Sequence, residues 1–298
     1  MRTTKRFTPS VLRRFRREGR GEGIYEGFGP WHQVSRGDPA SSGRSHLLDW
    51  KNRLRNLLSD REHEGQLFAT MPPDLDDSLE QFKLSLGDCT HPLAAYGDFH
   101  DTSLYPGTKR LAKELGIKHP LVRGDGETED WVPSTDIFLV FKPSNGPRAG
   151  LAVAIKPGFR MKGRTKELLR LEREVWVRRR IPWLLITPEQ YEESVGLTLR
   201  RVAPWALAEP VSVETRQTAA RIVRELPWHS FTSLIVHVGT ELGDFERAKC
   251  AVWQSVWCGE LPIDLRRGWR PHLPFTHVSP ETFWAFNPIA SRRSAWCD

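Results

Sequence analysis

Two apolar runs separated by a turn signal predict a β-hairpin in the middle of the chain. The first run, Asp-Ile-Phe-Leu-Val-Phe, begins at Asp136, and the second, Leu-Ala-Val-Ala-Ile-Lys, ends at Lys156. The linker contains Asn145-Gly146, which favours a tight turn between antiparallel strands. Because side chains alternate between the two faces of a strand, Ala154 and Lys156 share a face. We therefore expect a carboxylate and an ammonium group to lie side by side at one edge of a sheet.

Helical and strand patterns on both sides of this hairpin predict an α/β core. Ser59 or Asp60 can cap a helix with acidic residues in or near its first turn and apolar residues at 67–69. The other expected elements are a strand at 79–84, a helix at 108–118, an acidic loop at 125–130, a helix at 164–180 and a buried strand at 181–187. The order strand, hairpin, helix and strand is typical of an α/β fold.

The pattern changes after residue 190, so we divide the chain into domains at 1–190 and 191–298. The second part is mostly helical. Its expected elements are helices at 212–226, 229–239 and 240–258, followed by two short strands with a basic turn at 259–270. Helices followed by a basic hairpin match a winged-helix module. The rest, up to residue 298, is interpreted as a tail that becomes ordered on a partner.

Charge is distributed unevenly between these two parts. The chain has 298 residues and a net charge of +7; residues 1–190 carry 32 basic and 25 acidic side chains, and residues 191–298 carry 12 of each. This distribution suggests that the first part meets a polyanion and the second meets protein. Eight of the first 20 residues are basic, which favours either a nucleic-acid-binding arm or a solvated helix at 11–18. The candidate DNA-binding residues are Arg13, Arg14, Arg16, Arg17, Arg20, Arg44, Lys118 and His119.

Other protein classes find little support in the sequence. The cysteines at 89, 250, 258 and 297 show neither CxxC spacing nor a zinc-binding pattern with histidine. No apolar run approaches the length of a membrane span, and no secretion signal opens the sequence. We therefore expect a cytoplasmic protein with reduced thiols and no membrane partner.

The chemistry of the hairpin fits a metal-dependent phosphodiesterase. A carboxylate such as Asp136 can hold a divalent cation, and a lysine such as Lys156 can stabilise a phosphoryl oxygen or orient the attacking water. The hairpin alone leaves another interpretation open, in which Asp136 only begins a strand after a turn and Lys156 is a solvated charge.

Motifs in order along the first part of the chain resemble the TnsA family. These proteins are the endonuclease subunits of heteromeric cut-and-paste bacterial transposases, including CRISPR-associated relatives. The matching segments are Glu18–Gly23, Pro30-Trp31, Ser41–His46, Leu57–Glu62, Glu80–Phe82, Gly116–Pro120, Arg123-Gly124, Ser134–Asp136, Ile155–Pro157, Leu171–Glu174, Trp176 and Ile181–Trp183. The resemblance weakens after Thr187.

The resemblance implies a restriction-endonuclease-like core of the PD-(D/E)xK type, followed by a winged-helix C-terminal domain. It implies a Mg²⁺- or Mn²⁺-dependent endodeoxyribonuclease that nicks the non-transferred strand at the 5′ transposon ends. The metal ligands would be Glu62, Asp136 and the backbone carbonyl of Ile155. Lys156 would be catalytic with Glu62 and Asp136, and Glu172 would be a supporting acid.

The resemblance also implies partners and a location in the cell. The expected partners are double-stranded DNA at the transposon ends, a TnsB-like DDE transposase, and a TnsC-like AAA+ regulator that contacts the C-terminal region. A bacterial protein of this kind would associate with the nucleoid when it is active.

One departure from the family pattern supports an alternative. Ala154 stands where the family usually has Glu, Asp or Gln, and a methyl group cannot ligate a metal. The alternative is a catalytically impaired subunit retained for DNA binding or assembly. A stand-alone repair or restriction nuclease with the same core is a third interpretation.

Overall fold

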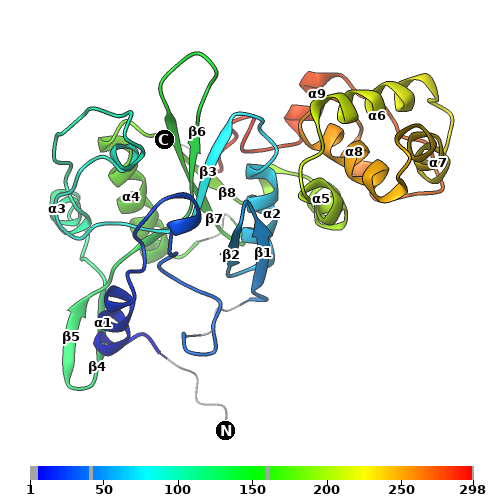
Figure 1. Ribbon diagram of the computed structural model, residues 1–298. Coiled ribbons are helices and arrows are strands. Elements are labelled where there is room, and N and C mark those ends of the chain that lie inside the picture. Colours follow the sequence, from blue (N-terminus) through cyan, green and yellow to red (C-terminus); the bar gives the residue numbers. More distant parts are fainter. Residues whose placement is uncertain (1–5, 40–42, 159–160, 297–298) are drawn as a thin grey trace, which may run out of the picture. The chain divides into compact units, whose positions relative to one another are not determined.

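The computed structural model of the chain (Figure 1) describes residues 6–39, 43–158 and 161–296. The chain divides into two compact units. The first unit comprises Met1–His63, Asp74–Thr187 and Ala295–Asp298, and the second comprises Glu64–Pro73 and Pro188–Ser294. In the described part of the chain, no helix is long and apolar enough to cross a membrane.

A mixed sheet is the centre of the first unit. Its strands lie in the order β3 (Leu75–Lys83), β6 (Ser134–Phe141), β7 (Ala149–Ile155) and β8 (Trp183–Ile186). The pairs β3–β6 and β6–β7 are antiparallel, so the central hairpin is confirmed, and β7–β8 is parallel. A parallel pair needs a crossover connection, and α4 (Gly163–Arg178) supplies it. The expected α/β order is therefore present.

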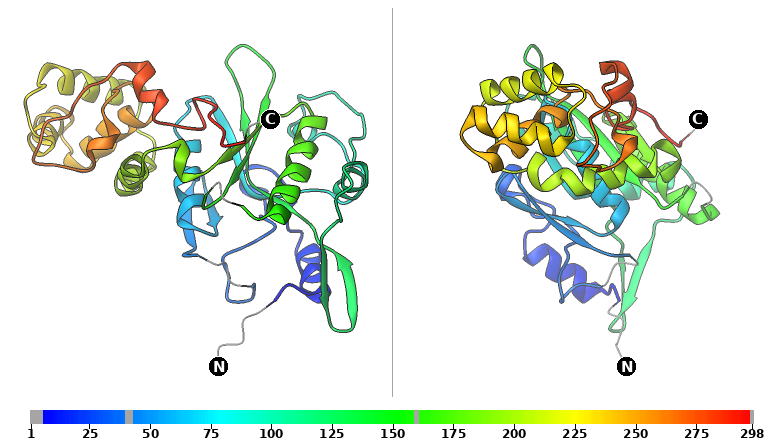
Figure 2. Two further views of the ribbon diagram at one scale, coloured as in Figure 1. Left: turned by 180° about the vertical axis from the view of Figure 1, so that it is seen from behind. Right: turned by 90° about the vertical axis from the view of Figure 1, so that its right-hand side faces the viewer.

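Apolar side chains on one face of this sheet pack against α4, which runs alongside the strands in both views of Figure 2. Trp176 of α4 is buried and its ring stacks on Phe138 of β6, with 4.8 Å between the ring centroids. The indole nitrogen of Trp176 also donates a hydrogen bond of 2.8 Å to the hydroxyl of Thr135. Ala154 of β7 is fully buried in the same apolar cluster. This packing fixes α4 against β6 and β7.

A buried ion pair joins β3 to the hairpin of β1 (His46–Trp50) and β2 (Arg53–Leu57). The guanidinium of Arg53 donates to both carboxylate oxygens of Glu80 at 2.7 Å, and the backbone N–H of Asn56 donates to the same carboxylate at 3.0 Å. The side chain of Glu80 is fully buried. Because one buried charge satisfies the other, this pair ties the β1–β2 hairpin to the sheet.

The segment expected to be an acidic loop at 125–130 is instead part of a second hairpin, β4 (Leu121–Gly124) and β5 (Glu127–Asp130). Asp125 and Gly126 form its turn, and both have positive φ, at 54° and 76°. A type I′ hairpin turn needs positive φ at both central positions, which explains the Asp-Gly dipeptide. The other elements of this unit are α1 (Pro9–Arg17), η1 (Tyr25–Gly27), the start of α2 (Asp60–Ala69), η2 (Pro92–Tyr96) and α3 (Thr108–Glu114).

Helices make up most of the second unit. They are η3 (Pro188–Gln190), α5 (Glu193–Ala206), α6 (Val213–Glu225), α7 (Phe231–Leu242), α8 (Phe245–Trp257), η4 (Leu265–Arg267) and α9 (Pro280–Ala285). The helix α8 is the core of this bundle, because α5, α6 and α7 all pack against it. Its residues from Ala251 to Trp257 are all buried.

Two expectations for the second unit are wrong. The two short strands expected at 259–270 are not formed; the short helix η4 lies there, and Ile263 makes an isolated bridge with His277. Up to Ser294 the expected tail is folded as part of the second unit, and Phe283 of α9 is fully buried. Asn287 is also fully buried, and its amide donates to the carbonyl of Phe68 at 2.8 Å.

The buried pair of Arg53 and Glu80 gives a stability prediction. Glu80→Ala leaves the guanidinium of Arg53 buried without its carboxylate, so we expect a loss of about 3–5 kcal/mol in the free energy of unfolding. Urea unfolding at pH 8 measures this loss, because burial raises the pKa of Glu80 to about 7. The control is Glu127→Ala, which removes an exposed ion pair with Arg13 and should change stability little. Equal losses in both variants would contradict this role for the pair.

Candidate functional site

Asp136 and Lys156 meet at the end of the β6–β7 hairpin, where the sequence places them. The ammonium of Lys156 donates to one carboxylate oxygen of Asp136 at 2.7 Å. The backbone N–H of Ile155 donates to the same oxygen, Oδ2, at 2.6 Å. Asp136 is 9% exposed. This carboxylate is therefore held by two donors and reaches the surface only at its edge.

Glu62 lies in the first turn of α2, which begins with a capping interaction. The hydroxyl of Ser59 accepts the backbone N–H of Glu62 at 3.1 Å, as the sequence predicts. The carboxylate oxygen Oε2 of Glu62 accepts the backbone N–H of Leu58 at 2.9 Å. These contacts fix the Glu62 side chain beside the strand that leads into α2.

Gln81 joins Glu62 to the sheet, and the sequence patterns did not single it out. Its amide donates to Oε2 of Glu62 at 3.0 Å, and its carbonyl accepts the hydroxyl of Ser134 at 3.1 Å. Gln81 has a positive φ of 50° and lies between the paired residues Glu80 and Phe82 of β3. The signal for it in the sequence was its place in Glu80–Phe82, one of the segments that carry the family resemblance.

Burial and like charge raise the pKa of Glu62 to about 7. Burial is the larger cause, the negative charge of Asp136 adds to it, and the amide of Leu58 and the charge of Lys156 oppose it. Two carboxylates thus repel each other in a place with little water. A group with this pKa changes its protonation state near neutral pH.

Lys156 and Glu172 complete the charged cluster. Burial alone would lower the pKa of Lys156, but the negative charges of Asp136 and Glu172 outweigh it, and the pKa is raised. Lys156 therefore remains a cation at neutral pH. Burial raises the pKa of Glu172 to about 7, while the charge of Lys156 opposes that rise. The indole N–H of Trp183 donates to Glu172 at 3.3 Å.

A cavity of about 270 Å³ opens beside this cluster, with Asp136, Lys156 and Glu172 in its lining. The rest of the lining is mainly apolar and includes Leu168 of α4 and Trp131. Glu172 therefore brings a second carboxyl group to the cavity, from α4.

The carboxylates of Glu62 and Asp136 are ligands of the type that a hard divalent cation prefers. Mg²⁺ and Mn²⁺ prefer carboxylate and carbonyl oxygens, and the repulsion between Glu62 and Asp136 is what such a cation relieves. Within residues 6–39, 43–158 and 161–296, however, no group of three His, Cys, Asp or Glu side chains is close enough to hold a metal ion. The side-chain oxygens alone therefore form no closed metal cage.

The arginines predicted to bind DNA differ in their surroundings. Arg20 is buried and pairs with Asp38 at 2.5 Å, and Arg14 pairs with the same carboxylate at 2.5 Å. Both therefore stabilise the N-terminal segment itself. Arg17 is exposed and forms no ion pair with the described residues. Arg44 is exposed as well.

Two further arginines of α1 face the β4–β5 hairpin. Arg13 pairs with Glu127 and Arg16 pairs with Glu129, each at 2.5 Å. Both pairs lie at least partly in solvent, so they are open to competition by another anion. Of the expected basic arm, Arg2 and Lys5 lie outside the described residues.

Lys118 and His119 lie between α3 and β4. The Lys118 side chain is exposed, and its backbone carbonyl accepts a hydrogen bond from Arg164 at 2.5 Å. The ring of His119 contacts the hydroxyl of Thr108 at 3.2 Å and lies 3.5 Å from the carboxylate of Asp130. Burial lowers its pKa. Lys118 is therefore available to a ligand, while His119 already has partners inside the unit.

Comparison with curated proteins identifies a relative. The chain is 30% identical over 241 residues to the Transposon Tn7 transposition protein TnsA of Escherichia coli, a match that covers 80% of this chain and 73% of the relative. No protein-family model matches the chain. The matched part of the chain is longer than the first unit alone.

The raised pKa of Glu62 gives a prediction about stability and pH. In the folded chain Glu62 holds its proton up to about pH 7, whereas in the unfolded chain it releases it near pH 4.3. Between these values the folded state binds more protons, so this group lowers the free energy of unfolding as the pH rises. Glu62→Gln removes this penalty and should stabilise the metal-free protein by about 3 kcal/mol at pH 8.

Urea unfolding of the wild type and of Glu62→Gln at pH 5 and pH 8 measures the effect. The difference between the two proteins should be much smaller at pH 5 than at pH 8, because at pH 5 Glu62 of the wild type is still protonated in the folded state and the pH lies close to its unfolded pKa. A difference that does not change with pH would contradict the raised pKa of Glu62.

Proposed function

Because the chain belongs to the TnsA family, we propose that it is the metal-dependent DNA endonuclease subunit of a transposase. It nicks the non-transferred strand at the 5′ transposon ends for cut-and-paste DNA transposition. The observation that carries this proposal is the meeting of Asp136 and Lys156 at one strand end, at 2.7 Å. The buried Glu62, whose pKa Asp136 raises, supports it.

The carboxylates of Glu62 and Asp136 and the backbone carbonyl of Ile155 would hold a Mg²⁺ or Mn²⁺ ion. Such an ion, when bound, lowers the pKa of a water molecule and stabilises charge on the phosphate. The side chains of Glu62 and Asp136 are held by neighbouring amides, so little rearrangement is needed to present them.

Lys156 acts as a fixed positive charge in this proposal. Its raised pKa keeps it protonated, so it cannot be the base that removes a proton from water. It instead neutralises negative charge that develops on a phosphoryl oxygen. Asp136 positions the ammonium, and Glu172 contributes a second negative charge that keeps it protonated.

Glu172 supports the site in place of the missing acid at position 154. Ala154 is fully buried in the apolar cluster between β7 and α4, so it offers no side-chain ligand. Glu172 lines the same cavity as Asp136 and Lys156. With a pKa of about 7, the carboxyl group of Glu172 can hold or release a proton near neutral pH.

The finer fold assignment is part of the proposal. We propose that the first unit is a restriction-endonuclease-like core, which the mixed sheet β3-β6-β7-β8 and its crossover helix α4 support. We propose that the second unit is a winged-helix-like domain, supported by the packing of α6 and α7 against α8. The isolated bridge at Ile263 would take the place of the wing strands.

The proposed partners are duplex DNA at the transposon ends, a TnsB-like DDE transposase and a TnsC-like AAA+ regulator. The regulator would contact the C-terminal region. Trp228, between α6 and α7, is 87% exposed, and an exposed tryptophan is a frequent anchor of protein interfaces. CRISPR-associated transposons are one setting for such an assembly.

A catalytically impaired subunit that only binds DNA or assembles the transposase is the second candidate function. Ala154 favours it, because the position is fully buried and apolar. In this alternative the ion pair of Lys156 and Asp136 would stabilise the strand end and perform no chemistry.

Cleavage of labelled transposon ends distinguishes these candidates. The wild type, Asp136→Ala and Lys156→Ala are each combined with the cognate transposase, the regulator and Mg²⁺. We expect both variants to lose 5′-end nicks by about 10²-fold or more, because each loses an electrostatic contribution to the transition state. Cuts on the opposite strand should persist, since another subunit makes them.

The variant Arg110→Ala serves as a control. Arg110 is an exposed residue of α3 that pairs with Glu114 and Asp88, and its loss should leave nicking unchanged. Nicking by Asp136→Ala or Lys156→Ala at the wild-type rate would show that the catalytic site lies elsewhere. A wild type that never nicks while it binds the regulator would favour the assembly subunit.

We also propose that the basic face of the first unit binds DNA through Arg13, Arg14, Arg16, Arg17, Arg20, Arg44, Lys118 and His119. The ion pairs of Arg13 with Glu127 and of Arg16 with Glu129 would compete with the phosphates. The buried Arg20 and the half-buried Arg14 would act by holding the segment in place.

This competition predicts that neutral side chains on β5 strengthen DNA binding. In Glu127→Gln/Glu129→Gln, Arg13 and Arg16 lose their carboxylate partners and become available to phosphates, so the affinity should rise several-fold at low salt. Titration of a labelled duplex in EDTA measures it. The matched control is Glu225→Gln/Glu246→Gln in the second unit, which removes the same charge elsewhere. The same gain in the control would attribute the effect to net charge alone.

A further inference from the structure

A basic groove lies between α5 and the loop after η4 in the second unit. It encloses about 240 Å³, and the lining includes Leu197, Thr198 and Arg201 of α5 and Arg266, Arg267 and Arg270 of η4 and the following loop. Arg201 lies four positions after Leu197 and three after Thr198, so its side chain neighbours both on the helix surface. We refer to this surface as the arginine groove.

Positive charge is concentrated at the arginine groove. It holds four of the 12 basic residues found in 191–298, a stretch that is neutral as a whole. Arg266 is neutralised, because it donates to both carboxylate oxygens of Asp264 at 2.8 and 2.9 Å. The guanidinium of Arg267 donates to the hydroxyl of Thr276, and Arg267 also interacts electrostatically with the carboxylate of Asp264.

Arg201 and Arg270 have no ion pair with any residue that the structure describes, and both are exposed. Of the described residues that line the groove, none is acidic. The guanidinium groups of Arg201 and Arg270 therefore retain uncompensated charge at the groove, and Arg267 adds a charge that shares Asp264 with Arg266.

Aromatic packing holds the loop that carries these arginines. The ring of Trp269 lies 4.8 Å from that of Phe231 and 5.5 Å from that of Trp205, measured between ring centroids. The backbone N–H of Phe231 donates to the carbonyl of Leu273 at 3.1 Å. Because the loop is fixed at both of these points, its charges are positioned before a ligand arrives.

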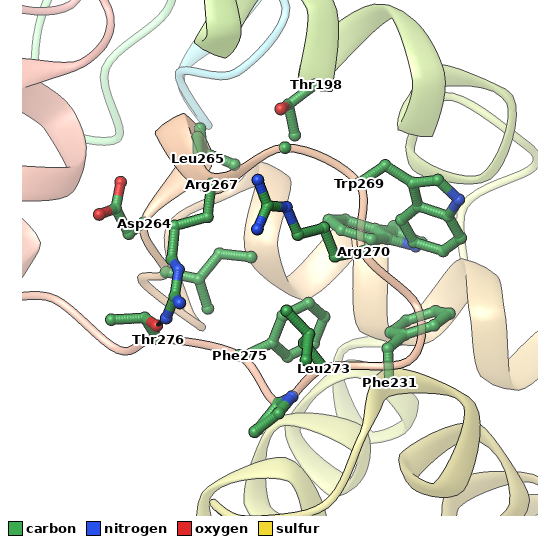
Figure 3. Close-up of a pocket in the computed structure, with 14 residues that line it drawn as sticks. Thr198, Phe231, Asp264, Leu265, Arg267, Trp269, Arg270, Leu273, Phe275 and Thr276 are labelled. Atoms are coloured by element: carbon green, nitrogen blue, oxygen red, sulfur yellow. Dashed lines mark hydrogen bonds between the residues drawn. The ribbon is translucent and has the colours of Figure 1, made fainter.

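The arginines at the two ends of this loop point in different directions. In Figure 3 the side chain of Arg270 extends back towards Thr198 of α5, whereas that of Arg267 runs the opposite way to Thr276. One carboxylate cannot satisfy guanidinium groups that diverge in this way. A polymer with an anion on every residue can, and guanidinium groups bind phosphates with two parallel hydrogen bonds.

We propose that the arginine groove binds the phosphodiester backbone of duplex DNA. The side chains of Arg201, Arg267 and Arg270 contact phosphates. Contacts of this kind fix position and affinity without reading sequence. This binding rests on the proposed function for its ligand and deepens it by adding a DNA contact in the second unit, and no residue of the Asp136–Lys156 site takes part.

The salt dependence of DNA binding tests the proposal. The full chain is titrated against a labelled duplex in EDTA, where no cleavage occurs, at several salt concentrations. Each phosphate contact contributes about 0.9 to the slope of log K against log salt concentration. Arg201→Gln/Arg270→Gln should therefore reduce the slope by about 1.8.

The control variant Arg221→Gln/Lys249→Gln removes the same charge from the second unit. Both residues are already paired on their own helices, Arg221 with Glu225 and Lys249 with Glu246, and the slope should stay unchanged. An equal fall in slope for both double variants would overturn the proposal, because it would reflect net charge alone. An unchanged, wild-type slope in Arg201→Gln/Arg270→Gln would also overturn the proposal. If that variant in addition no longer binds the AAA+ regulator, the groove is a protein-binding surface.

The same titration separates this proposal from the nuclease proposal. Because no cleavage occurs in EDTA, the slope does not depend on whether the wild type cleaves DNA. Because Arg201 and Arg270 are exposed, their replacement should leave the thermal midpoint of unfolding unchanged. If the wild type binds DNA and the slope falls in Arg201→Gln/Arg270→Gln, the result supports DNA binding at the arginine groove even if no nicking is observed.

Discussion

One positive charge balances a group of buried negative charges at the end of the β6–β7 hairpin, and the first unit is arranged around it. Lys156 donates to Asp136 at 2.7 Å, and Glu62 and Glu172 approach from two different helices. Burial, and to a smaller degree the negative charge of Asp136, raises the pKa values of both glutamates to about 7. Such a cluster is unfavourable for folding, and the surrounding amides and indoles hold it in place. A site of this kind is typical of catalysis on a polyanion, where a further cation restores the balance.

Local patterns were sufficient for much of the first unit. The alternation of faces placed Lys156 on the same side as Ala154, and the structure brings Lys156 to Asp136. The capping residue Ser59 was also recognised from its position before acidic residues. These features depend on neighbours in the sequence or on a hairpin, so short-range rules describe them well.

Features that depend on distant contacts escaped the sequence. The helix α5 contains Gly196 and Pro204, two residues that normally argue against a helix, and its packing against α8 overrides them. The tail folds because Asn287 satisfies backbone groups more than two hundred positions away. The β4–β5 hairpin is different, since its Asp125-Gly126 turn was visible, but acidic strands such as Glu127–Asp130 lack the apolar alternation that marks a strand.

The left-handed backbone of Gln81 has a consequence for how this chain can evolve. A positive φ of 50° costs a residue with a side chain about 1 kcal/mol relative to glycine. Selection for stability alone would therefore favour glycine at this position. Glycine lacks the amide that binds Glu62 and Ser134, so relatives that keep the long polar side chain there are the ones under selection for the charged cluster. A long polar side chain at position 81 is therefore expected in homologues that still need the charged cluster, and glycine is expected where the cluster is no longer needed.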